Sequence, residues 1–108
     1  MKNQYSNTVY LYSKLISLDS TKGEYYFNRA YSYSMLQNTD SSIQDYLKSI
    51  KTGYKISKSY QNIGGIYFAV INNDSLAVYY YSKSLEYDPE NIKVKMLLEE
   101  SKKHLTKD

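Results

Sequence analysis

Apolar side chains recur at every third or fourth position along most of the chain, a spacing that places them on one side of an α-helix. Four such stripes are present: Tyr26, Ala30 and Tyr33; Ile43, Tyr46 and Ile50; Tyr60, Gly64 and Tyr67; and Val78, Tyr81 and Leu85. The polar segments QNTDS and NNDS separate the two stripes of each pair and supply the Asn, Asp and Ser residues that favour turns. The pattern therefore predicts two helical hairpins.

The two hairpins are copies of one repeating unit. Tyr12, Tyr46 and Tyr81 lie 34 and 35 residues apart, and the lysine two positions after each keeps the same spacing. The first helices agree, because Tyr26 and Tyr60 are also 34 residues apart. The period lengthens by one residue near the segment NND, where a turn can absorb an insertion. A period of this length indicates a helical repeat protein.

Small and aromatic residues on the stripes predict how the helices pack. Gly64 lets a neighbouring helix approach closely. Gly65 has no such packing role. It either makes the helix thinner on the side that faces a binding groove or costs ~1 kcal/mol of helix stability. Helical geometry directs Tyr79 and Tyr80 about 200° and 100° away from Tyr81. We expect both on the outer surface or against the next helix. The tyrosines expected in the core are Tyr26, Tyr33, Tyr46, Tyr60, Tyr67 and Tyr81.

Composition narrows the functional classes. The 14 basic and 11 acidic residues are dispersed along the 108-residue chain, so its net charge of +3 lacks the clustering typical of nucleic-acid-binding proteins. Without cysteine, neither a disulfide nor a thiolate metal site is possible. No apolar run reaches the ~18 residues of a membrane span, and the start MKNQYSNTVY lacks a signal peptide's apolar centre. A cytoplasmic location is favoured if Met1 is the native start, and the abundance of Lys, Asn, Ser, Tyr and Ile suggests a bacterial origin.

A 34-residue helix-turn-helix unit with these residues resembles the tetratricopeptide repeat (TPR) family. The segment YQNIGGIY matches the family's large aromatic, Leu-Gly pair and Tyr, and LAVYYYSKSLEYDPEN matches its Ala, Tyr, Ala and Asp-Pro positions. The segment YFNRAYSY departs from the pattern, with Arg29 in the Leu position and Ala30 in the Gly position, and the terminal Pro is present only at Pro89. The resemblance implies an all-α fold, a right-handed α-solenoid of about six helices.

The repeat boundaries divide one expected domain, residues 1–108, into four parts. They are a half repeat consisting of a second helix (4–19), a complete repeat (23–56), a complete repeat with a one-residue turn insertion (57–91) and a C-terminal capping helix (90–105). We expect Asp40 and Asp74 to cap the second helices. Pro89 is expected at the first position of the closing helix, with Asp88 as its cap.

Residues suited to catalysis are few. The sole histidine, His104, lies near a polar C-terminal end, and Glu99 and Glu100 point in different directions on a helix. Asp40 and Asp45 are interpreted as caps or solvated charges. We therefore expect no enzyme activity, no cofactor and no metal site.

The TPR resemblance implies that ligands bind the concave face, which is lined by the first helix of each hairpin. Asn28 and Asn62 stand where the family's asparagines bond the backbone of an extended peptide or bridge neighbouring helices, and both roles stay open. Phe27, Tyr31 and Phe68 would supply apolar pockets. The expected peptide-binding groove comprises Phe27, Asn28, Tyr31, Met35, Lys58, Gln61, Asn62, Phe68 and Lys93.

One TPR subtype holds a C-terminal carboxylate with paired Lys, Asn and Arg residues from three repeats, and this chain departs from it. Phe27 and Tyr31 occupy positions that need Lys and Asn, and Leu97 stands where a basic residue is required. The remaining fragments of the pattern are Lys58, Asn62 and Lys93. A chaperone-tail clamp is therefore not expected.

The leading hypothesis is a non-catalytic protein-protein interaction scaffold that binds a peptide or partner helix of unknown identity. A second is a structural segment of a longer array, or a self-associating module that dimerises through Val9, Leu11 and Leu15 of its N-terminal helix. RNA binding by a related helical-repeat family is a distant third. The 34-residue period, the Asp-Pro junction and the dispersed charge argue against it, so no nucleic acid is expected.

Overall fold

The computed structural model describes residues 2–106. Over this range the chain forms six α-helices, one short π-helix and no strand, which confirms the expected all-α fold class. The elements are α1 (Lys2–Leu18), α2 (Gly23–Met35), α3 (Thr39–Thr52), α4 (Ile56–Ile66), η1 (Tyr67–Ile71), α5 (Asp74–Tyr87) and α6 (Ile92–Thr106). No helix in the described part of the chain is both long and apolar enough to span a membrane.

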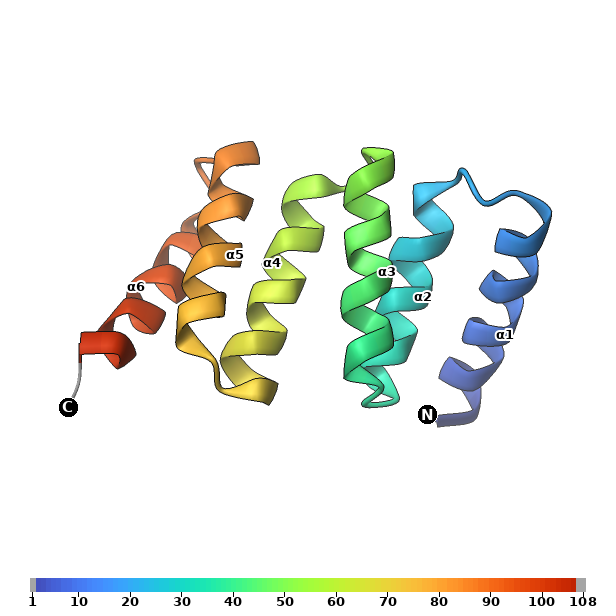
Figure 1. Ribbon diagram of the computed structural model, residues 1–108, viewed down its shortest axis with the longest axis horizontal. Helices are drawn as coiled ribbons and strands as arrows, with labels where there is room; N and C mark the ends of the chain where they lie inside the picture. Colours follow the sequence, from blue (N-terminus) through green and yellow to red (C-terminus); the bar gives the residue numbers. More distant parts are fainter. Residues whose placement is uncertain (1, 107–108) are drawn as a thin grey trace. The chain divides into compact units, whose positions relative to one another are not determined.

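The helices belong to two compact units. The first unit ends at Lys55 and contains α1, α2 and α3, with α2 packed against both of its neighbours (Figure 1). The second unit begins at Ile56, and in it α5 packs against both α4 and α6. Each unit therefore holds one complete helical hairpin and one additional terminal helix.

A buried ion pair joins the three helices of the first unit. The guanidinium of Arg29 donates to both carboxylate oxygens of Asp45, from Nε at 2.6 Å and from Nη2 at 3.0 Å. Its Nη1 donates to Ser13 Oγ of α1 at 3.0 Å. The guanidinium carbon also lies 6.0 Å and 5.6 Å from the ring centres of Tyr26 and Tyr33. The hydrogen bond with Asp45 raises the pKa of Arg29 above its ordinary value, so the arginine stays charged.

The interpretation of Asp45 as a solvated charge is wrong, because its side chain is only 3% exposed. A carboxylate buried to this degree needs a partner, and Arg29 supplies one from the position where the TPR pattern has Leu. In the second repeat the equivalent positions hold Ile63 and Tyr80, which lie 34 and 35 residues later. One repeat therefore uses a charge pair where the other uses an aliphatic and an aromatic side chain.

Close packing of α4 on α5 depends on Gly64. A Cβ atom at this position would lie 2.7 Å from Cδ1 of Tyr81, a distance that no side chain accepts without movement. Tyr81 cannot easily yield, because it is 1% exposed and belongs to a core with Ala77, Val94 and Leu98. The role inferred for Gly64 from the sequence is confirmed.

The three consecutive tyrosines of α5 have separate environments. Tyr81 fills the core, whereas Tyr79 is 54% exposed. Tyr80 stacks on Tyr67 with ring centres 5.5 Å apart, and it also lies 6.2 Å from the ring of Tyr60. Tyr80 therefore packs against the first helix of its own repeat, and not on the outer surface or the next helix as its helical angle suggested.

Asparagine occupies the N-cap positions of both second helices, so the expectation that Asp40 and Asp74 cap them is wrong. Asn38 is the N-cap of α3, and Asn73 is the N-cap of α5. The side chain of Asn73 accepts a hydrogen bond from the Leu76 amide at 3.0 Å. The two aspartates lie in the first helical turn, where a negative charge interacts favourably with the helix dipole.

The closing helix begins later than expected. Helix α6 starts at Ile92 and not at Pro89, and Asp88 ends α5. The side chain of Asn91 accepts a hydrogen bond from the Val94 amide at 3.1 Å, so Asn91 acts as the N-cap of α6.

The additional residue of the second repeat coincides with the π-helix η1 (Tyr67–Ile71). A π-helical turn accommodates one inserted residue inside a helix. The amide of Asn73 donates to the Tyr67 carbonyl at 2.8 Å, and Asn72 ends the helix with a φ of 63°. The loop that follows η1 has two residues, against three between α2 and α3. The insertion therefore lengthens the helix and not the turn.

The six tyrosines expected in the core divide into two groups. The buried ones are Tyr26, Tyr46 and Tyr81, and the half-buried ones are Tyr33, Tyr60 and Tyr67. A phenol hydroxyl must reach water or a polar partner, which favours half-buried positions. Tyr26 finds a protein partner, because its hydroxyl donates to the Ser20 carbonyl at 2.9 Å.

Burial raises the pKa of Tyr81 to about 12, from an ordinary value of 10.0, and this predicts a loss of stability at high pH. Below pH ~10 the phenol is protonated in both states; between ~10 and ~12 only the unfolded chain releases the proton. The free energy of unfolding should fall over this window by about 3 kcal/mol through Tyr81. Urea unfolding of the wild-type chain and Tyr81→Phe at a series of pH values measures this contribution. Equal pH dependence in the two proteins would contradict it.

Candidate functional site

Four residues of the expected groove lie on α2 in the first unit. Tyr31 and Met35 are 49% and 45% exposed, and Asn28 is half-buried. These three residues follow one another at intervals of three and four, so they share one side of the helix. This surface offers two apolar side chains and an amide to a ligand.

Phe27, the fourth residue, contributes mainly to packing within the first unit. Its ring lies edge-on to Tyr46 and Tyr54, with ring centres 5.5 Å and 5.8 Å apart. The Lys55 ammonium lies 5.0 Å from the centre of the Phe27 ring. Lys55 thus adds a positive charge beside this surface, and its φ of 47° belongs to a turn conformation that the sequence pattern did not reveal.

Tyr5 of α1 also borders this surface and was not predicted. Its ring lies edge-on to Tyr31, with ring centres 6.2 Å apart. The aromatic pair joins two helices, so recognising it from sequence requires knowing which sides of α1 and α2 face each other.

The other five expected residues belong to the second unit: Lys58, Gln61 and Asn62 on α4, Phe68 in η1, and Lys93 on α6. Both lysines are exposed, and Asn62 and Phe68 are half-buried. Gln61 is only 8% exposed, and its side-chain oxygen accepts a hydrogen bond from the Asn91 amide group at 3.4 Å. Gln61 therefore links α4 to the start of α6 and offers little surface to a ligand.

Phe68 stacks on His104, a residue for which the sequence indicated no role. Their ring centres are 5.5 Å apart with planes at 10°. His104 Nδ1 lies 3.1 Å from Asp74 Oδ1, and Nε2 lies 3.3 Å from Glu100 Oε2. His104 thus connects α6 with η1 and with the first turn of α5. Phe68 and His104 are 36 positions apart in sequence, so no local pattern predicts the contact.

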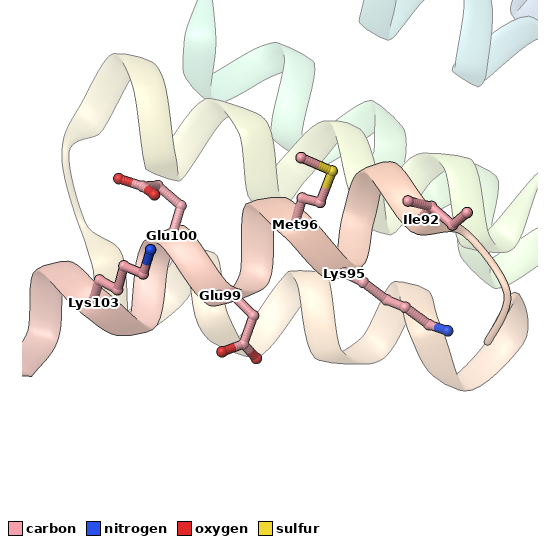
Figure 2. Close-up of a pocket in the computed structure, with 6 residues that line it drawn as sticks. All are labelled: Ile92, Lys95, Met96, Glu99, Glu100 and Lys103. Atoms are coloured by element: carbon pink, nitrogen blue, oxygen red, sulfur yellow. The ribbon is translucent and has the colours of Figure 1, made fainter.

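A shallow hollow of about 360 Å³ runs along the outer side of α6. Its lining residues all come from this helix: Ile92, Lys95, Met96, Glu99, Glu100 and Lys103. Figure 2 shows Lys95 and Glu99 pointing to one side of the helix, and Met96 and Glu100 pointing to the other. Since one helix supplies every wall, the hollow does not enclose a ligand.

The residues suggested for self-association lie on α1 with unequal exposure. Leu11 is 54% exposed, whereas Val9 and Leu15 are half-buried. Leu18, at the end of the same helix, is the most exposed of the four at 83%. No residue of α1 is buried.

The chemistry of these surfaces suits binding. Within residues 2–106, no group of three His, Asp or Glu side chains is arranged to hold a metal ion. The exposed side of α2 and the residues Lys58, Asn62, Phe68 and Lys93 of the second unit present amides and lysines that can form hydrogen bonds, together with aromatic side chains that can make apolar contacts.

Comparison with known proteins identifies the fold. No protein-family model matches the chain, and a search of curated proteins also finds no match. Among solved structures, the chain is similar to the first TPR of Spaghetti (RPAP3), whose structure is bound to the HSP90 peptide SRMEEVD. The TM-score is 0.85 with 22% sequence identity, over 97% of this chain and 82% of that chain. The chain therefore has a TPR-like fold.

Proposed function

We propose that this chain is a non-catalytic protein-interaction scaffold whose first helices bind a peptide or a partner helix. The observation that carries the proposal is the exposed side of α2, where Tyr31 and Met35 present apolar surface beside the amide of Asn28. Aromatic anchors of this kind supply much of the binding energy in protein interfaces. The similar solved structure, which contains a bound peptide, supports the same class of ligand.

In the second unit, the residues expected to contact a ligand are Lys58, Asn62, Phe68 and Lys93. The exposed lysines favour a peptide with acidic residues, because opposite charges increase the association rate. Phe68 offers part of its ring, since His104 and Tyr81 cover the rest.

We expect the chain's ligand to differ from the peptide of the similar structure in lacking a bound C-terminal carboxylate. SRMEEVD ends in an Asp residue with a free C-terminal carboxylate. Phe27 and Tyr31 stand where a carboxylate-gripping TPR needs Lys and Asn, and they hold no positive charge. We infer that internal peptide segments, rather than free C-termini, are bound here.

Selection from a display library of random peptides tests the proposal. We expect Tyr31→Ala to weaken binding of the selected peptides about tenfold, because it removes an exposed anchor without opening the core. Tyr10→Ala on α1 is the matched control: Tyr10 is 66% exposed, and its loss should leave binding unchanged. SRMEEVD serves as the comparison peptide and should not bind below about 1 mM. If Tyr31→Ala and Tyr10→Ala change peptide affinity equally, or if the selection enriches no peptide, the proposed peptide binding by the first helices is wrong.

A second candidate function is a structural segment of a longer array, or a module that self-associates through its terminal helices. The exposure of Leu11 and Leu18 on α1 favours it, since contact with another helix would remove this apolar surface from water. Sedimentation over a wide concentration range separates this candidate from the first, because only self-association makes the mass depend on concentration.

A further inference from the structure

Glycine at position 65 is required neither by the backbone conformation nor by packing. Among the glycines of the described chain Gly53 has a positive φ, whereas Gly65 lies inside α4 with an ordinary helical backbone. A Cβ atom at Gly65 would approach no side-chain atom closer than 3.8 Å, whereas a Cβ atom at Gly64 would lie 2.7 Å from the Tyr81 ring. Because glycine inside a helix is less stable than alanine, Gly65 points to a role other than folding.

The absence of a side chain at Gly65 leaves an opening that reaches the Tyr81 hydroxyl. Apart from the α4 backbone and the two adjacent residues, this oxygen is the only atom of the described chain within 4 Å of the position that a Cβ would take. Gly65 is half-buried, and Ala69, four residues later, is exposed, so the opening lies at the surface of the second unit. We call this opening the Gly65 notch.

The hydroxyl beneath the Gly65 notch has no partner within the described chain. The Tyr81 side chain is 1% exposed, and burial raises its pKa to about 12 without a contribution from a hydrogen bond or a neighbouring charge. Within residues 2–106, Ser59 Oγ is the one side-chain polar atom that is both sealed from water and unpartnered. The Tyr81 hydroxyl therefore keeps a narrow access to solvent, and its hydrogen-bond partner must come from outside the chain.

We propose that the main chain of a bound peptide crosses α4 at Gly65, and that one of its carbonyl oxygens accepts a hydrogen bond from the Tyr81 hydroxyl. This contact presupposes the peptide binding proposed above for the second unit. Asn62 and Phe68, two of the residues expected to contact the peptide, lie three positions before and three positions after Gly65, on the same side of the helix. The peptide therefore meets the notch between an amide and an aromatic ring.

A neutral main-chain carbonyl suits the Gly65 notch better than a charged group does. Glycine lets another backbone approach closely, because no Cβ stands in the way. The Tyr81 phenol keeps its proton at neutral pH and can donate it to an acceptor. A carboxylate here would lose hydration without compensation, since no charged group of the described chain interacts with this phenol. The carbonyl of an internal peptide bond meets these conditions.

A tyrosine replaces this glycine in the first repeat. Tyr31 stands 34 residues before Gly65 and is 49% exposed. Its side chain offers apolar contact where the second repeat offers a hydrogen-bond donor beneath bare backbone. The two repeats thus contribute different contacts, a side-chain anchor from Tyr31 and a main-chain hydrogen bond from Tyr81.

Tyr81→Phe tests the contact with little disturbance of the fold, because the hydroxyl bonds no other residue and the ring that fills the core is kept. The probe is a fluorescently labelled peptide enriched by the display selection on the complete 108-residue chain. Its affinity, measured by fluorescence anisotropy, should fall about fivefold for Tyr81→Phe. Tyr79→Phe is the matched control: it removes the hydroxyl of a tyrosine that is 54% exposed and should leave the affinity unchanged.

Replacing the carbonyl oxygens of the probe by sulfur, one at a time, identifies the carbonyl that enters the Gly65 notch. Sulfur is a larger atom and a weaker hydrogen-bond acceptor than oxygen. One position should weaken binding to the wild-type chain about fivefold and should matter at least about threefold less for Tyr81→Phe, because the hydrogen bond is already absent there. A structural effect of Tyr81→Phe would not depend on which oxygen is replaced.

Gly65→Ala separates binding from stability. The added methyl group would occupy the notch, so the probe should bind about tenfold more weakly. The same substitution should raise the urea concentration at the unfolding midpoint, because alanine favours the helix. A loss of affinity in a more stable chain cannot be caused by unfolding.

Equal affinity of the probe for the wild-type and Tyr81→Phe chains would overturn the proposed contact. A Gly65→Ala chain that binds as tightly as wild type, or a sulfur scan in which no position depends on Tyr81, would also overturn it. If Tyr31→Ala weakens binding and Tyr81→Phe does not, the chain binds peptides without using the Gly65 notch. If the selection enriches no peptide, both the peptide-binding function and this contact are wrong.

Discussion

Replacing Arg29 by methionine should lower the free energy of unfolding by about 3–5 kcal/mol at neutral pH. Methionine keeps the length of the unbranched side chain but lacks the guanidinium. The Asp45 carboxylate, which is 3% exposed, is therefore left without its bidentate partner. It also removes the hydrogen bond from Arg29 to Ser13, which connects α1 to the pair. Urea unfolding followed by circular dichroism measures the change.

The chain itself provides the control for this prediction. Its second repeat has Ile63 and Tyr80 at the positions of Arg29 and Asp45, and Tyr80 stacks on neighbouring aromatic rings there. The double variant Arg29→Ile/Asp45→Tyr should therefore recover most of the stability that Arg29→Met loses, because no buried charge is left unpaired. If the double variant is as unstable as Arg29→Met, the loss does not arise from an uncompensated carboxylate.

The second large effect on stability is expected when a single methyl group is added at Gly64. Gly64→Ala should lower the free energy of unfolding by about 2 kcal/mol, although alanine is intrinsically the better helix former by about 1 kcal/mol. The added Cβ would lie 2.7 Å from Cδ1 and 2.8 Å from Cε1 of Tyr81, a ring that the core holds in place. Thermal and urea unfolding both report the change.

Gly65→Ala, one residue later, is the matched control with the opposite sign. A Cβ at Gly65 would lie 3.8 Å from the Tyr81 hydroxyl, which is an ordinary contact. The same substitution should therefore stabilise the chain by about 0.5–1 kcal/mol through helix propensity. If both glycines respond with the same sign, packing against Tyr81 is not what selects glycine at position 64.

Much of the architecture follows from local pattern. The stripes spaced three and four residues apart predict the helices, and the 34-residue period predicts their pairing into hairpins, because both depend on positions that are near one another in sequence. The small residue at Gly64 even predicts close approach to a neighbour. Helix ends were less predictable: at residues 38, 73 and 91 an asparagine takes the N-cap position, and the nearby aspartates do not.

The candidate binding surfaces could be predicted only in part. The repeat pattern predicted the exposed side of α2 that carries Tyr31 and Met35. It also predicted Gln61 as a groove residue, but Gln61 is buried and hydrogen-bonded to Asn91. It did not indicate Tyr5 or His104. Each of these outcomes depends on a side chain from another helix, and a sequence pattern does not specify how two helices are rotated against each other.

The sequence by itself determined the fold class and the repeat, since both are encoded in the spacing of residues along one chain. The tertiary structure alone decided which side chains meet: Arg29 with Asp45, Tyr80 with Tyr67, and Phe68 with His104. The physical reason is that periodicity fixes the side of a helix that avoids water, whereas pairing across helices depends on their distance and rotation.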